Sequence, residues 1–128
     1  MSKILVTGSL GLVGSACMEF FSAKGWEVTG IDNNARSKFF GTEELEFSFG
    51  NNLVDIRNEA NVNRLFELSG GFDAIIHAAA QPSHDYATDH VLEDFDCNAR
   101  ATVILLEATR KYCPQATFVY VSTDKVYG

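Results

Sequence analysis

Three glycines near the start of the chain have a spacing suited to phosphate binding. Gly8, Gly11 and Gly14 recur every three residues, directly after an apolar run at residues 4–6. Such a run is typical of a strand covered on both faces, and the glycines allow a sharp turn, close approach of a ligand and close packing of a helix. The first N–H groups of that helix lack internal partners and lie at the positive end of its dipole. We therefore predict a strand–turn–helix unit that binds the phosphates of a dinucleotide.

An acidic residue at the end of the next predicted strand supports this interpretation. Asp32 follows Gly14 at close to the ~20-residue distance at which a carboxylate binds the adenosine ribose hydroxyls. A carboxylate there would repel the 2′-phosphate of NADP, so Asp32 favours NAD, although Arg36 and Lys38 follow closely. The alternative is a solvated aspartate that merely ends a strand.

Predicted strands and helices alternate along the chain. Strands are expected at residues 4–6, 26–32, 52–57, 72–77 and 117–122. Helices are expected after Gly14, after Asn58 and at residues 89–111, with stops at Gly25 and at Gly70 and Gly71. This alternation predicts an α/β fold: a Rossmann-like, doubly wound parallel sheet with five strands in the order 3-2-1-4-5, lacking the sixth strand of the usual arrangement. Residues 1–128 then form one domain.

Apolar periodicity also predicts which helix faces point inward. In the first helix the expected inner residues are Val13, Ala16, Cys17, Phe20 and Phe21. In the helix at residues 89–111 they are Val91, Phe95, Thr102, Leu105, Leu106 and Thr109.

Composition narrows the class of protein. The net charge of −7 argues against a nucleic-acid partner and against an anionic membrane surface. The three cysteines form no C-x-x-C pair, which indicates neither a disulfide framework nor a zinc site, and we expect no metal. No signal peptide or membrane span is recognised, so the expected location is cytoplasmic.

Several short motifs occur together in a fixed order. They are Thr7-Gly8-x-x-Gly11-x-x-Gly14, Asp32-Asn33, Asp55-Ile56-Arg57, His77-Ala78-Ala79-Ala80, Asn98 and Ser122-Thr123-Asp124-Lys125-Val126-Tyr127-Gly128. With them the chain resembles the N-terminal part of the extended short-chain dehydrogenases/reductases, the NAD-dependent nucleotide-sugar epimerases and dehydratases. The stretch Ala80-Gln81-Pro82-Ser83-His84-Asp85 is most similar to the CDP-paratose 2-epimerase (CDP-tyvelose epimerase) branch.

The resemblance implies NAD as cofactor and a nucleotide-diphosphate sugar as substrate of a completed site. The implied contacts are Gly8, Gly11, Leu12 and Val13 with the pyrophosphate, Asp32 and Asn33 with the adenosine ribose, Asp55 and Ile56 with adenine, Ala78, Ala79 and Ala80 with the nicotinamide side, and Asn98 with the nearby backbone. Thr123 matches the catalytic hydroxyl that hydrogen-bonds the sugar hydroxyl being oxidised. Asp124 matches an acid of the dehydratases, but Lys125 stands where those enzymes have a second acid.

One family motif is missing. The sequence has no Tyr-x-x-x-Lys pair, which in such enzymes removes the hydroxyl proton, and the family's C-terminal sugar-binding segment is absent as well. The first hypothesis is therefore the NAD-binding portion of a nucleotide-sugar epimerase, which binds NAD without turnover and is truncated or completed by a second chain. The alternative is a non-catalytic NAD-binding sensor or interaction module, whose exposed strand edge could pair with a second chain or a second copy.

Two further patterns carry less weight. Ser83-His84-Asp85 contains the residue types of a catalytic triad, but neighbours in sequence do not point at one another as a triad needs. His77 ends a strand, where a hydrogen-bonded structural role is expected more than a role as base.

Overall fold

The computed structural model describes residues 1–33, 51–80 and 88–122. Its elements, in chain order, are β1 (Lys3–Thr7), α1 (Leu12–Ala23), β2 (Glu27–Asp32), β3 (Asn51–Leu53), α3 (Glu59–Ser69), β4 (Ala74–His77), α5 (Val91–Phe95), the π-helical η1 (Asp96–Arg100), α6 (Ala101–Tyr112) and β5 (Thr117–Tyr120).

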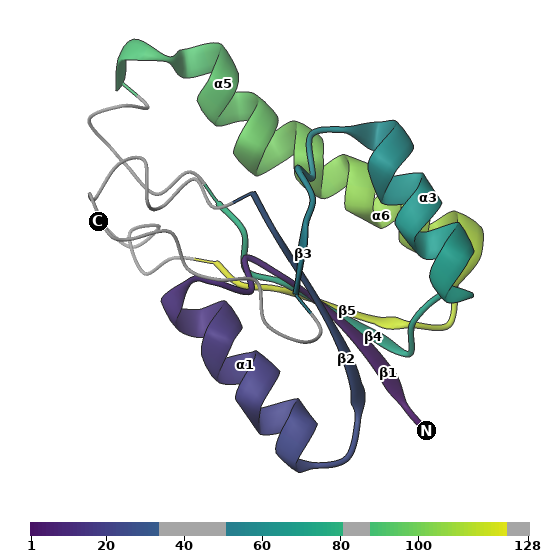
Figure 1. Ribbon diagram of the computed structural model, residues 1–128. Helices are drawn as coiled ribbons and strands as arrows, with labels where there is room; N and C mark the ends of the chain where they lie inside the picture. Colours follow the sequence, from purple (N-terminus) through teal and green to yellow (C-terminus); the bar gives the residue numbers. More distant parts are fainter. Residues whose placement is uncertain (34–50, 81–87, 123–128) are drawn as a thin grey trace.

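The five strands form one parallel sheet in the order β3-β2-β1-β4-β5. Figure 1 shows α1 on one face of this sheet and α3, α5 and α6 on the other. The predicted fold class, strand order and doubly wound arrangement are thereby confirmed. Because all strands run the same way, the loops that follow them meet at one edge of the sheet.

The central strand β1 is completely buried at its apolar positions. Ile4, Leu5 and Val6 are each 0% exposed, between β2 on one side and β4 on the other. Full burial of side chains of this size contributes about 2 kcal/mol each before the conformational entropy is subtracted. The unbroken apolar run in the sequence therefore reflects a strand that is covered on both faces, as predicted.

The main core lies between the sheet and the layer of α3 and α6. Phe66 of α3 is fully buried and meets the Phe72 ring edge-to-face, with 5.2 Å between ring centroids. Asn58 caps α3 because its side-chain oxygen accepts from the N–H of Asn61 at 3.1 Å, and Gly70 ends the helix in the left-handed conformation (φ +75°). Both predicted ends of this helix are confirmed.

The predicted inner face of α1 was partly wrong. Val13, Ala16 and Phe20 are exposed, whereas Gly14 is buried and Cys17 is half-buried. Apolar residues occupy more than half the circumference of this helix, so periodicity could not select the side that meets the sheet.

The predicted inner face of the last long helix was wrong in its first turns. Val91 is 67% exposed and Phe95 is 58% exposed, and Leu106 is also exposed. Leu105 and Thr109 are buried as predicted, and Ala101, Ile104 and Ala108 are buried as well. The π-helical stretch η1 accounts for Val91 and Phe95, because the one residue that it inserts rotates the face before it by about 100° relative to the face that follows.

Candidate functional site

The glycine turn between β1 and α1 is as tight as its spacing predicts. Gly8 has φ +70°, which favours glycine. A Cβ built on Gly14 would lie only 1.9 Å from the Gly8 carbonyl oxygen, so α1 packs directly against the turn. A Cβ on Gly8 would lie 2.8 Å from the backbone nitrogen of Ala79, so the turn also touches the loop after β4. Two of the three glycines are thus required by close backbone contacts.

The N-terminus of α1 suits an anion. Its N-cap residue is Gly11, no side chain caps it, and its first turn contains no acidic residue. Leu12 and Val13, in that first turn, are exposed. The first N–H groups of a helix have no intrahelical partner, so this end offers donors and a positive dipole to a phosphate.

A buried hydroxyl in the same turn lacks a partner. Ser9 is 2% exposed, and among the described residues its Oγ is a buried side-chain atom without a hydrogen bond. An unpaired buried hydroxyl costs about 1–3 kcal/mol, and such groups are rare away from ligand sites. The donors and this orphan hydroxyl fit a phosphate-bearing cofactor at the turn.

Asp32 faces the glycine turn. It ends β2, and its Oδ2 accepts a hydrogen bond from the N–H of Leu10 at 3.0 Å. The turn is also held to β2 by two backbone bonds, in which the N–H groups of Gly8 and Ser9 donate to the Ile31 carbonyl at 2.9 and 3.3 Å. The structure therefore brings the predicted ribose and pyrophosphate residues together. Asn33 follows Asp32 and is exposed.

The loop of residues 78–80 lies on the other side of the turn. The N–H of Ala78 donates to the Thr7 carbonyl at 3.2 Å, and the N–H of Ala79 donates to the Thr7 hydroxyl at 3.1 Å. Ala78 and Ala79 are half-buried, and Ala80 is exposed. Because small side chains leave the backbone accessible, this loop can lie against a flat ring.

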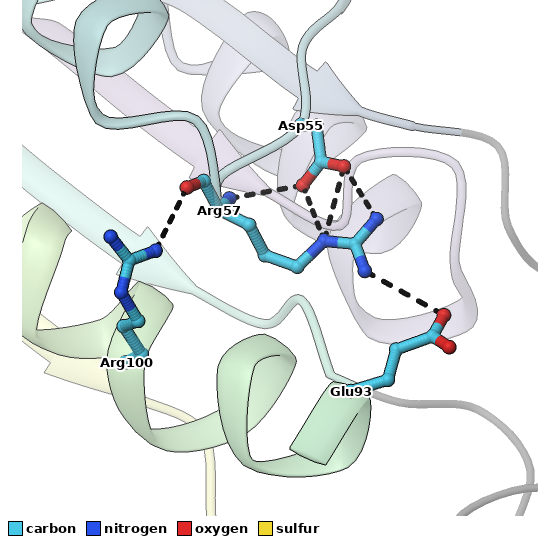
Figure 2. Close-up of polar contacts among 4 residues, drawn as sticks. All are labelled: Asp55, Arg57, Glu93 and Arg100. Carbon is cyan, nitrogen blue, oxygen red and sulfur yellow. Dashed lines mark hydrogen bonds and ion pairs between the residues drawn. The ribbon is translucent and has the colours of Figure 1, made fainter. Parts of the chain in front are cut away.

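Asp55 is held by a neighbouring arginine (Figure 2). Its Oδ2 accepts from the Arg57 guanidinium at 2.6 Å, and its Oδ1 accepts from the Arg57 main-chain N–H and Nε at 3.0 Å each. Hydrogen bonding to Arg57 lowers the pKa of Asp55 below its ordinary value, although burial opposes this. The carboxylate thus stays ionised and keeps one orientation. The Ile56 side chain belongs to the core, which leaves only its backbone for a nucleotide.

The Arg57 guanidinium also reaches the helix on the far side of the site. Its NH1 lies 3.6 Å from Glu93 of α5, and Arg100 of η1 donates to the Arg57 carbonyl at 3.2 Å. The Asp55–Arg57 side chains are about one-third exposed, so each ion pair contributes at most about 1 kcal/mol. These contacts join α5 and η1 to the loop that carries Asp55.

Asn98 lies within the π-helical stretch. Its side-chain amide donates to Asp94 of α5 at 2.9 Å, and its main-chain carbonyl accepts from the Thr102 hydroxyl at 2.6 Å. These two contacts join Asn98 to its own helix, and its role toward the neighbouring backbone stays a prediction.

Sequence reasoning missed two groups of residues that organise this edge. Arg57 had no role assigned, although the Asp-x-Arg spacing is a local signal for a carboxylate–guanidinium pair. Glu93 gave no signal, because its partner is far away in the sequence, and Thr102 was expected only as an inward residue of its helix. His77 was expected to be a hydrogen-bonded structural residue, and the structure confirms this with contacts to Thr7 and Thr102.

Some predicted residues lie outside the described ranges. They are Thr123, Asp124 and Lys125, the Ser83-His84-Asp85 stretch, and Arg36 and Lys38. Within residues 1–33, 51–80 and 88–122, no group of three or more His, Cys, Asp or Glu side chains is arranged to hold a metal ion. In the same ranges, no helix is both long and apolar enough to cross a bilayer.

The chain is similar to curated epimerases over nearly its whole length. It is 36% identical over 131 residues to CDP-paratose 2-epimerase of Salmonella typhi and 33% identical over 135 residues to UDP-glucose 4-epimerase of Pisum sativum. Each comparison covers 98% of this chain but only 38% of the relative, so the chain spans less than two-fifths of their length.

Solved structures agree with this likeness. The UDP-glucose 4-epimerase of Thermotoga maritima with UDP-glucose matches with a TM-score of 0.80 at 28% identity, covering 94% of this chain and 38% of that one. The Thermus thermophilus UDP-glucose 4-epimerase in complex with NAD matches with a TM-score of 0.71 at 34% identity, covering 86% and 34%. A family model described as the NAD dependent epimerase/dehydratase family matches residues 4–128. The chain therefore belongs to the NAD-dependent epimerase/dehydratase family.

Proposed function

We propose that this chain binds NAD and forms the cofactor-binding domain of a nucleotide-diphosphate-sugar epimerase. The observation that carries the proposal is that three segments of the chain meet at one turn. The helix N-terminus at Gly11, the carboxylate of Asp32 and the backbone of Ala79 all lie within contact distance of the turn at Gly8–Leu10. A dinucleotide contains a pyrophosphate, two riboses and two flat rings, and such an arrangement fits the pyrophosphate, one ribose and one ring.

The residues that would hold NAD lie at the carboxyl edge of the sheet. They are Gly8, Gly11, Leu12 and Val13 for the pyrophosphate, Asp32 and Asn33 for the adenosine ribose, Asp55 and the Ile56 backbone for adenine, and Ala78, Ala79 and Ala80 for the nicotinamide side, with Asn98 supporting the nearby backbone. NAD supplies a hydride acceptor when bound, which in the epimerase reaction takes hydride from a sugar carbon and returns it. The side chain of Asp32 disfavours the 2′-phosphate of NADP, so NAD is the proposed form.

Turnover by this chain alone is not expected. The sequence lacks a Tyr-x-x-x-Lys pair to accept the sugar hydroxyl proton, while Thr123 is the proposed hydroxyl that positions the sugar. The relatives that this chain matches act on CDP-paratose and on UDP-glucose according to their names. We propose a nucleotide-diphosphate sugar as the substrate class once the site is completed.

Calorimetry tests the proposal directly. NAD titrated into the folded protein is expected to release or absorb heat with one site per chain, and NADP is expected to bind more weakly. A chain that is folded by circular dichroism and shows no NAD binding by calorimetry or fluorescence would refute the proposed function. Conversion of UDP-glucose or a CDP-sugar into its epimer is expected to be absent.

A second proposal follows from the edge of the sheet. β5 is an edge strand among the described strands, and Val119 and Tyr120 on it are 45% and 54% exposed. A second chain or a second copy could add a strand there, either to complete the catalytic site or in a non-catalytic NAD-binding sensor or interaction module. Light scattering over a hundred-fold range of protein concentration distinguishes a second copy from a different chain, because a monomer at every concentration excludes self-pairing.

The three cysteines are free, which agrees with the proposed cytoplasmic location.

A further inference from the structure

A continuous line of hydrogen bonds runs beneath the loop that we assign to the nicotinamide side. The N–H of Ala79 donates to the Thr7 hydroxyl at 3.1 Å, and this hydroxyl lies 2.6 Å from Nδ1 of His77. On the other side of the ring, Nε2 of His77 lies 2.9 Å from the Thr102 hydroxyl. The Thr102 hydroxyl in turn lies 2.6 Å from the main-chain oxygen of Asn98. The line thus joins β1, β4 and the loop to the π-helical stretch η1.

The direction of every bond in this line follows from the number of hydrogens available. A threonine hydroxyl has a single hydrogen, and the Asn98 carbonyl can only accept, so Thr102 must donate to it. Toward His77 the Thr102 oxygen is therefore an acceptor, which places the ring hydrogen on Nε2. A neutral imidazole then has a bare Nδ1, and that atom accepts the hydrogen of the Thr7 hydroxyl.

The surroundings of the ring favour the neutral form. His77 is 1% exposed, and the rings of Phe118 and Tyr120 lie 6.2 and 5.7 Å from it, centroid to centroid. Burial lowers the pKa of His77 to about 4. With both ring nitrogens engaged, the side chain has no free atom with which to exchange protons with a substrate.

We propose that His77 is a positioning residue that, as the Nε2–H tautomer, couples the π-helical stretch at Asn98 to the amide of Ala79 and so sets the backbone against which the nicotinamide side of NAD lies. The inference rests on the proposed function only for the identity of the ligand. Ala79 also touches the glycine turn, because its nitrogen lies 2.8 Å from the position of a Cβ on Gly8. A displacement of Ala79 therefore reaches the pyrophosphate side of the site as well.

Thr102 offers the sharpest variant because the same helix contains a matched control. Thr102→Val removes the acceptor of His77 Nε2 together with a hydroxyl bond to the carbonyl four residues earlier. Thr109→Val removes the same kind of bond, from Thr109 to the Leu105 carbonyl at 2.8 Å, without touching His77. Thr102→Ser restores the hydroxyl. Calorimetry with NAD and hydrogen exchange of the Ala79 amide by NMR are measured on all three variants and on the wild type.

Thr102→Val is expected to weaken NAD binding about three- to ten-fold and to speed exchange of the Ala79 amide, while Thr109→Val changes neither and Thr102→Ser restores both. Equal effects of Thr102→Val and Thr109→Val on both readouts would overturn the proposal, because they would indicate a general loss of helix stability. The ring-nitrogen NMR spectrum of the wild type needs no variant: a hydrogen on Nε2 supports the proposal, and a hydrogen on Nδ1 overturns it. If the wild type shows no NAD binding, the proposed function fails, whereas the Ala79 exchange and the ring spectrum still test the role of His77.

Discussion

Gly14→Ala separates packing from helix propensity at the turn. In an exposed helix the change would stabilise by about 1 kcal/mol, since alanine is the better helix former. At this position the new Cβ would lie 1.9 Å from the Gly8 carbonyl oxygen and 2.6 Å from its carbon, both of them backbone atoms. Either α1 or the turn must therefore retreat by about 1 Å, and overpacking of this kind costs about 1–3 kcal/mol. We expect the free energy of unfolding to fall by about 1–2 kcal/mol.

The same displacement should weaken NAD binding, because the helix N–H groups and the turn are held in one geometry. A shift of about 1 Å in several short hydrogen bonds predicts at least a ten-fold rise in the Kd for NAD. The matched control is Gly25→Ala, just beyond the opposite end of α1. Gly25 has φ +84° with no atom within 4 Å of a new Cβ, so its alanine variant loses about 1–2 kcal/mol by backbone strain alone.

Urea unfolding measures the stability of the two variants, and calorimetry measures their affinity for NAD. Both should lose stability, but only Gly14→Ala should lose NAD affinity. A folded Gly14→Ala protein that binds NAD as tightly as Gly25→Ala would refute the reasoning, because the contact between α1 and the turn would then be irrelevant to the site.

Three other predictions follow from single contacts. Asp32→Asn should weaken NAD binding about ten-fold and reduce the preference over NADP, measured by calorimetry with both cofactors; an unchanged preference would contradict the role of the Asp32 charge. Protonation of buried His77 should destabilise the fold in acid, because the folded pKa of about 4 lies below the unfolded value of 6.5. The stabilising contribution of neutral His77 is therefore complete above pH 6.5, and about 3 kcal/mol of unfolding free energy is lost on lowering the pH to 4. Urea unfolding at pH 7 and pH 4 measures this loss. A His77→Gln variant should lack this part of the pH dependence, and an identical slope in both proteins would disprove the assignment. Asn58→Ala removes the cap on Asn61 and should cost about 1 kcal/mol in unfolding free energy with no change in NAD affinity; a change in NAD affinity would mean that α3 takes part in the site.

Local chemistry explains why much of the site was predictable. The glycine spacing, the buried strand before it and the acid at the end of β2 are each defined by a few neighbouring residues. Their meeting at one edge follows from the parallel order of the strands, which the alternation of strands and helices already indicates. The Asp55–Arg57 pair is equally local, because only one residue separates the two side chains, but it was missed.

The helix faces were less predictable for a different reason. Periodicity identifies an apolar stripe only when the stripe is narrow, and α1 carries apolar residues on most sides. In the last helix a π-helical turn rotates the side of the helix that faces inward, and no residue type at positions 96–100 predicts that turn from the sequence. Val91 and Phe95 were therefore assigned to the wrong side.

By itself, the sequence determined the class of fold, the strand order, the glycine turn and the position of the acid that faces it, because each depends on short spacings and on backbone conformations that few residues allow. Only the tertiary structure decided that Asp32 reaches Leu10, that Arg57 meets Glu93, and that one ring joins Thr7 to Thr102. These contacts link segments that are distant in the chain, and their geometry exists only after the strands have paired and the helices have packed against the sheet.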